Sequence, residues 1–106
     1  MVTKQKKSDA MKFLEKITGG PLTLGGALEA IRLCEEESQS VFAKRLKISV
    51  QHLCNIERGH KVVSPERAVR FAKILGYSEK QFVRLALQDI LNRKGLKKYH
   101  VLIEAA

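Results

Sequence analysis

A group of amide, aliphatic and basic side chains lies near the middle of the chain. Gln51 and Asn55 are four residues apart, so on a helix they lie next to each other on one face. Each carboxamide offers a hydrogen-bond donor and an acceptor together, as the edge of adenine requires, and Val50 beside them can press against a thymine methyl. His52 and Arg58 suit phosphates or the edge of the groove. Together these residues can read base edges in a DNA major groove, whereas any one of them alone is equally consistent with a solvated helix face.

These side chains must be positioned by a helix that buries its other side. Leu53 and Ile56 lie three residues apart on that side, Ser49 begins the helix and Gly59 ends it. A shorter apolar pattern precedes it, with Ser38 as its cap, and its buried positions are Phe42, Ala43 and Leu46. Only about three residues separate the two helices, so they must cross steeply, as in a helix-turn-helix.

The stretch 38–59, SQSVFAKRLKISVQHLCNIERG, resembles the helix-turn-helix of lambda-repressor, Cro and Xre-type proteins. The matching residues are Gln39, Ala43, Leu46, Ser49, Leu53 and the closing run Ile56, Glu57, Arg58 and Gly59. The resemblance extends from about residue 24 to about residue 87 and implies an all-α fold of five helices around one core. One position departs from the pattern, because the turn residue after Leu46 is usually glycine and here is Lys47. A lysine held there in a left-handed conformation costs on the order of 1 kcal/mol.

The same resemblance implies roles for residues outside the base-reading face. Gln39 matches a glutamine that contacts a phosphate and braces the recognition helix, and backbone amides at that helix start add to the contact. Arg32 matches a basic residue that pairs with the glutamate of the closing run, so we expect it to contact Glu57; the alternative is two unrelated surface charges. The expected phosphate contacts are Ser38, Gln39, His52, Arg58 and Lys61. Such contacts set the register on DNA but carry no sequence information.

Composition agrees with a polyanionic partner. The 106 residues suit one domain, and 20 Lys and Arg against 11 Asp and Glu give a net charge of +9. Aromatic residues make up only 6% and Trp is absent, so stacking of single-stranded bases is poorly supported. No apolar run approaches the roughly 20 residues needed to span a bilayer, and the charged N-terminus lacks the apolar core of a signal peptide. We therefore expect a cytoplasmic, nucleoid-associated protein that contacts no membrane.

Cysteine and histidine spacing gives no support for a catalytic or metal site. Cys34 and Cys54 form no Cys-x-x-Cys pair and are expected to be free thiols; Cys54 either packs at the core edge or touches DNA. His52, His60 and His100 have no metal-binding spacing with one another or with the cysteines. We expect no enzymatic activity, no metal and no cofactor.

Two segments precede the resemblance. The composition of residues 1–8 predicts a basic flexible tail, which either reaches phosphates and a minor groove or is an untethered solubilising end. Residues 9–20 predict a short accessory helix between a cap at Asp9 and the pair Gly19 and Gly20.

The DNA-binding domain is expected to span residues 22–94, with three further helices beside the helix-turn-helix. They begin behind Thr23, Ser64 and Ser78, and the first of them runs to about residue 36. Gly76 ends the second, and Ser78 with Gln81 forms a capping box at the start of the third. Their expected buried positions are Ala27, Leu28, Ala30, Ile31 and Cys34; Ala68, Val69, Ala72, Ile74 and Leu75; and Phe82, Leu85, Ala86, Ile90 and Leu91.

Residues 95–106 form a C-terminal extension. Tyr99, Val101 and Ile103 alternate with His100 and Leu102, a weak signal for a short strand, which needs a partner to be stable. A homodimer would supply the partner and would place two recognition helices roughly 34 Å apart on a palindromic site. The alternative is a tail that folds back on its own subunit or stays disordered.

These patterns together predict a sequence-specific regulator of transcription that binds double-stranded DNA, most simply a repressor that occludes a promoter. The alternative is an antitoxin that masks a toxin protein and uses DNA binding to regulate its own operon. Small size, exposed termini and the absence of a ligand-binding domain keep that second hypothesis open.

Overall fold

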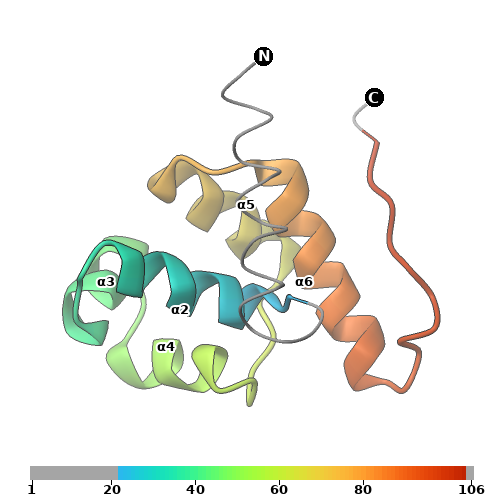
Figure 1. Ribbon diagram of the computed structural model, residues 1–106, viewed down its shortest axis with the longest axis horizontal. Coiled ribbons are helices and arrows are strands. Elements are labelled where there is room, and N and C mark those ends of the chain that lie inside the picture. The colour runs from blue at the N-terminus through green and yellow to red at the C-terminus, as the bar shows by residue number, and fades with distance from the viewer. Residues whose placement is uncertain (1–21, 105–106) are drawn as a thin grey trace.

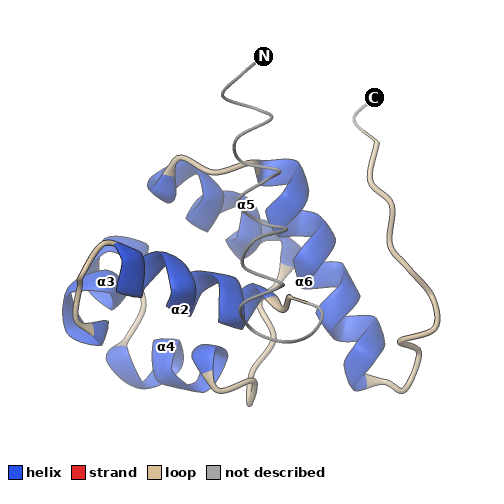
Figure 2. Cartoon of the chain, in the orientation of Figure 1, coloured by secondary structure: helices blue, strands red, loops and turns tan. Residues whose placement is uncertain are grey.

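A computed structural model describes residues 22–104, and in this range the only regular secondary structure is helical (Figures 1 and 2). The helices are α2 (Leu24–Cys34), α3 (Gln39–Leu46), α4 (Val50–Glu57), α5 (Pro65–Leu75) and α6 (Glu79–Arg93). The predicted all-α fold of five helices is therefore confirmed. The basic tail at 1–8 and the accessory helix expected at 9–20 lie outside the described residues.

Each of these helices starts behind a hydroxyl side chain that accepts a backbone N–H three residues further on. The capping residues are Thr23, Ser38, Ser49, Ser64 and Ser78, all as predicted. A cap of this kind is worth about 1 kcal/mol. The predicted capping box of α6 is only half formed, because Gln81 Oε1 accepts a hydrogen bond from Arg84 Nε at 3.0 Å.

The core is one apolar cluster to which every described helix contributes. Phe71 of α5 is fully buried although the sequence pattern did not single it out, and Cys34, expected inside, is exposed. Cys34 lies outside because α2 ends there, two residues earlier than predicted. Glu36 turns left-handed at φ 56°, and Glu37 N donates back to Arg32 O at 3.1 Å. Partly exposed positions that were expected inside are Ala30, Val69, Ile74, Leu75, Ile90 and Leu91.

The arrangement leaves α4 at the edge of the molecule. α5 packs along α6, and α2 packs against both α4 and α6, while α3 packs against α4 and α5 (Figure 1). Leu53 and Ile56 anchor α4 to the core, with 0% and 1% of their surfaces exposed. The opposite face of α4 therefore faces away from the core.

The turn between α3 and α4 is left-handed at Lys47, with φ 62° and ψ 40°. Lys47 thus keeps the conformation for which glycine is usual and carries a strain of about 1 kcal/mol. Ile48 N donates to Ala43 O at 3.0 Å, which satisfies a carbonyl near the end of α3.

The predicted strand in the C-terminal extension is wrong for residues 95–104, which contain no strand. This segment runs back beside α6 (Figure 1), and Gln88 holds it there. Gln88 Nε2 donates to Tyr99 O at 2.8 Å, and Val101 N donates to Gln88 Oε1 at 2.8 Å. One carboxamide thus supplies the donor and the acceptor that a neighbouring strand would have supplied.

Candidate nucleic-acid interface

The outer face of α4 holds the residues expected to contact bases. Val50 is 42% exposed, Gln51 is exposed and Asn55 is partly exposed. Gln51 Nε2 donates to Asn55 Oδ1 at 3.2 Å, so the two carboxamides are already aligned along the helix. The structure therefore brings these three residues together on a surface that faces solvent.

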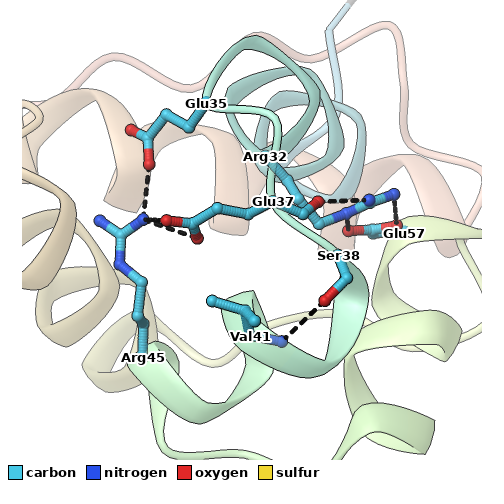
Figure 3. A network of polar contacts seen from close by, with 7 residues as sticks. All are labelled: Arg32, Glu35, Glu37, Ser38, Val41, Arg45 and Glu57. Carbon is cyan, nitrogen blue, oxygen red and sulfur yellow. Dashed lines mark hydrogen bonds and ion pairs between the residues drawn. The ribbon is translucent and has the colours of Figure 1, made fainter.

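The C-terminal end of α4 is fixed by Glu57, whose side chain is only 2% exposed. Arg32 of α2 donates from Nε to Glu57 Oε2 at 2.9 Å and from Nη2 to Glu57 Oε1 at 3.1 Å (Figure 3). Gln39 of α3 donates to Glu57 Oε1 at 2.9 Å, and Arg32 also reaches Glu37 O at 3.1 Å. The expected contact between Arg32 and Glu57 is thus present, and this one carboxylate joins α2, α3 and α4.

Two further contacts hold the same end of α4. A Cβ atom placed on Gly25 would lie 2.1 Å from Ile56 O, so α2 touches the backbone of α4 at a position that leaves room only for glycine. Arg93 of α6 donates from Nη2 to Gly59 O at 2.6 Å. In the sequence, Gly25 stands out only as a poor helix former. A glycine that is unfavourable inside a helix is the signal from which the close approach could have been inferred.

A shallow groove of about 460 Å³ lies beside the base-reading face, lined by Ser49, Gln51, His52, Asn55, Lys61 and Arg67. Arg67 comes from the first turn of α5, and its Nη1 lies 3.2 Å from both ring nitrogens of His52. Burial of the imidazole, with the nearby charges of Arg67 and Lys61, lowers the pKa of His52 below its usual value. The ring is therefore neutral at pH 7 in a groove that carries two cations.

A protein-family model for helix-turn-helix proteins matches residues 38–82. Residues 38–82 are a helix-turn-helix domain of the Cro/C1, or Xre, type. The match runs from the cap of α3 into the first turn of α6, so the domain contains α3, α4 and α5 complete. No significant match was found among curated proteins or among solved structures. A Cro/C1-type domain binds DNA, and its type is typically not enzymatic.

Four of the residues expected to contact phosphates lie at the two ends of the helix-turn-helix, and the fifth, His52, lies in the first turn of α4. Ser38 is exposed, and its Oγ accepts the Val41 N–H at 3.2 Å as the cap of α3 (Figure 3). Gln39 uses its Nε2 to brace Glu57. Arg58 and Lys61 are exposed beyond the end of α4.

Arg67 is the residue of this groove that the sequence pattern did not single out. It lies ten residues after Glu57, the last residue of α4, and belongs to another helix, so no helical periodicity connects it with His52. The sequence feature that could have indicated Arg67 is its position in the first turn of α5, after Ser64 and Pro65. The start of this helix was predicted correctly.

The remaining reactive side chains form no second site in the part of the chain described. Cys34 is exposed, Cys54 is partly buried, and both are free thiols. Between residues 22 and 104, His, Cys, Asp and Glu form no group of three that could hold a metal ion. Over the same range, no helix combines the length and apolar character that crossing a membrane requires.

Proposed function

We propose that this protein recognises a specific sequence in double-stranded DNA through α4 and regulates transcription, acting as a repressor that occludes a promoter. The observation that supports this most is that α4 has one apolar, buried face and one polar, exposed face. Leu53 and Ile56 are buried behind it, while Gln51 and Asn55 lie aligned on its outer face. A helix anchored in this way can enter a major groove with its carboxamides toward the bases.

Each residue of the interface has a defined role in this proposal. Gln51 and Asn55 bind the donor and acceptor edges of adenines, and Val50 packs on a thymine methyl. Residues that set the register on the phosphates are Ser38, Gln39, His52, Arg58 and Lys61. The buried pair of Arg32 and Glu57 contacts no DNA and fixes the angle at which α4 meets the groove.

Two copies bind a palindromic site in this proposal, and the C-terminal extension is the surface through which they associate. Tyr99 is 55% exposed and Leu102 is 89% exposed, so both side chains are open to contact with a second copy. Sedimentation at micromolar concentration measures the association, and a Leu102→Glu variant should shift the protein toward the monomer. A monomer in the unmodified protein would refute this part of the proposal.

The alternative function is that of an antitoxin which neutralises a toxin protein and regulates its own operon. Besides the C-terminal extension, Leu33 at the end of α2 is 59% exposed and Val41 on α3 is 51% exposed, and these apolar side chains are open to a protein partner. Co-purification of a small toxin, or a short toxin-like reading frame beside the gene, would favour this alternative over a dedicated repressor.

Selection of bound duplexes from a random pool tests the main proposal and supplies the operator. Gln51→Ala should then weaken binding by roughly 1–3 kcal/mol on the selected sequence and relax the preference at one base position. Gln81→Ala is the matched control, since Gln81 lies at the start of α6, far from α4 (Figure 1). Equal losses on selected and random DNA for Gln51→Ala would contradict base reading.

A further inference from the structure

The contact between His52 and Arg67 favours a neutral imidazole in the groove before DNA binds. An N–H of Arg67 can donate only to a ring nitrogen that carries a lone pair, and a protonated imidazole has none. The 3.2 Å contact from Arg67 Nη1 to the ring therefore matches the neutral form of His52. In the free protein Arg67 therefore donates a hydrogen bond to a neutral His52 ring, and protonation of the ring would break this hydrogen bond.

The surroundings of His52 favour this neutral form from more than one element. Arg67 faces the ring from α5, and Lys61 faces it from the loop between α4 and α5. The other side chains that line the groove, from α4 and its cap, are the uncharged Ser49, Gln51 and Asn55. The groove thus concentrates positive charge and lacks a lining carboxylate within the described structure, so an anion is the ligand that it suits.

We propose that one backbone phosphate of bound DNA occupies this groove between Lys61 and Arg67, and that His52 takes up a proton when the phosphate enters. This inference rests on the proposed function, and it adds Arg67 to the phosphate-binding residues. The phosphate offsets the repulsion between the two cations and the ring. Once protonated, His52 donates to a phosphate oxygen and releases Arg67, whose N–H groups turn to the phosphate as well.

The sign of the resulting pH dependence follows from linkage. Phosphate binding raises the pKa of His52 above its value in the free protein, so the complex holds more protons than its separate parts. Affinity for DNA therefore increases as pH falls through the interval between these two pKa values. A single proton limits the slope to about tenfold in Kd per pH unit for each subunit.

The test uses the full-length protein and a duplex of random sequence, because a phosphate contact does not depend on the bases. Kd is measured by fluorescence anisotropy from pH 5.5 to pH 8 at constant, low ionic strength. His52→Asn should flatten the dependence, while His60→Asn, which alters an exposed histidine beyond α4, should leave it unchanged. NMR titration of the His52 ring should show a higher pKa with duplex bound, and Arg67→Gln should raise the pKa in the free protein.

Two results from the variant and the NMR titration would each overturn the inference. One is a His52→Asn variant with the same slope as the unmodified protein; the other is a ring pKa that does not rise when duplex is added. If the protein binds duplex with a pH-independent Kd, the proton uptake is refuted while the DNA-binding function stands. If it binds no duplex at any pH in low salt, the proposed function fails and the inference fails with it.

Discussion

Replacing Gly25 by alanine tests whether α2 sets the position of the recognition helix. In most helices this change is favourable by up to about 1 kcal/mol, because alanine is the better helix former. Here the added Cβ would lie 2.1 Å from Ile56 O and 3.0 Å from Ile56 C. Both atoms belong to the backbone, so the clash can be relieved only if α2 and α4 separate.

The magnitude follows from comparing the two effects. Forcing an extra carbon into a packed contact costs about 1–3 kcal/mol, and more where no side chain can rotate away. Separation of the helices also lengthens the hydrogen bonds of 2.9 and 3.1 Å between Arg32 and Glu57. Gly25→Ala should therefore lower the free energy of unfolding by about 1–3 kcal/mol, which corresponds to a fall in Tm of roughly 5–20 °C.

Gly26→Ala is the matched control for this experiment. It changes the next residue of the same helix and gains the same propensity, but its Cβ would meet only side-chain atoms, Thr23 Oγ1 at 3.1 Å and Leu22 Cδ1 at 3.9 Å. Thermal and urea unfolding of both variants measures the difference, and DNA affinity at a temperature where both are folded measures the displacement of α4. Equal stability of the two variants would refute a close backbone approach at Gly25.

Two other changes test the supports of the recognition helix, and a third tests the contact between Asp89 of α6 and the start of α2. Arg32→Ala leaves the Glu57 carboxylate buried without its ionic partner and should cost about 3–5 kcal/mol in urea unfolding; a loss below 1 kcal/mol would mean that the pair is dispensable. Lys47→Gly removes the strain of the left-handed turn and should stabilise by up to about 1 kcal/mol, so a lower Tm would contradict the strain. Burial raises the pKa of Asp89 to about 6, although the hydrogen bond from the Leu24 N–H and the charge of Arg93 act in the opposite direction. Because the folded state then binds the proton more tightly than the unfolded state, the unfolding free energy should decline as pH rises from about 4 to about 6. Asp89→Asn should lose that decline, and an identical pH profile in the variant would exclude Asp89 as its source.

The parts of the fold that local chemistry specifies could be predicted from the sequence. Ser38, Ser49 and Ser64 each cap the helix that they were expected to cap, because a hydroxyl before an apolar periodic stretch satisfies the first free N–H groups within three residues. The burial of Leu53 and Ile56 follows equally from helical spacing. These features depend only on neighbours in the chain, so the sequence contains all that is needed to infer them.

The features that the sequence did not reveal depend on contacts between distant elements. The requirement for Gly25 arises from the carbonyl of Ile56 on another helix, and propensity alone describes that glycine as a defect. The strand predicted around Val101 failed for a related reason. Its alternation was read as half of a sheet, while the side chain of Gln88 satisfies the backbone instead.

The contacts around α4 also explain how a helix of only eight residues can serve as a recognition element. Isolated helices of this length are unstable in water, so packing must supply their order. Its C-terminal end is held by Arg32, Gln39 and Arg93 from three different helices, and its start is fixed by the Ser49 cap after the strained turn. Because these groups are already in place without DNA, binding need not spend free energy on ordering the helix. Weakening any one support should therefore reduce affinity for every DNA sequence, whereas changing Gln51 or Asn55 should alter which sequence is preferred.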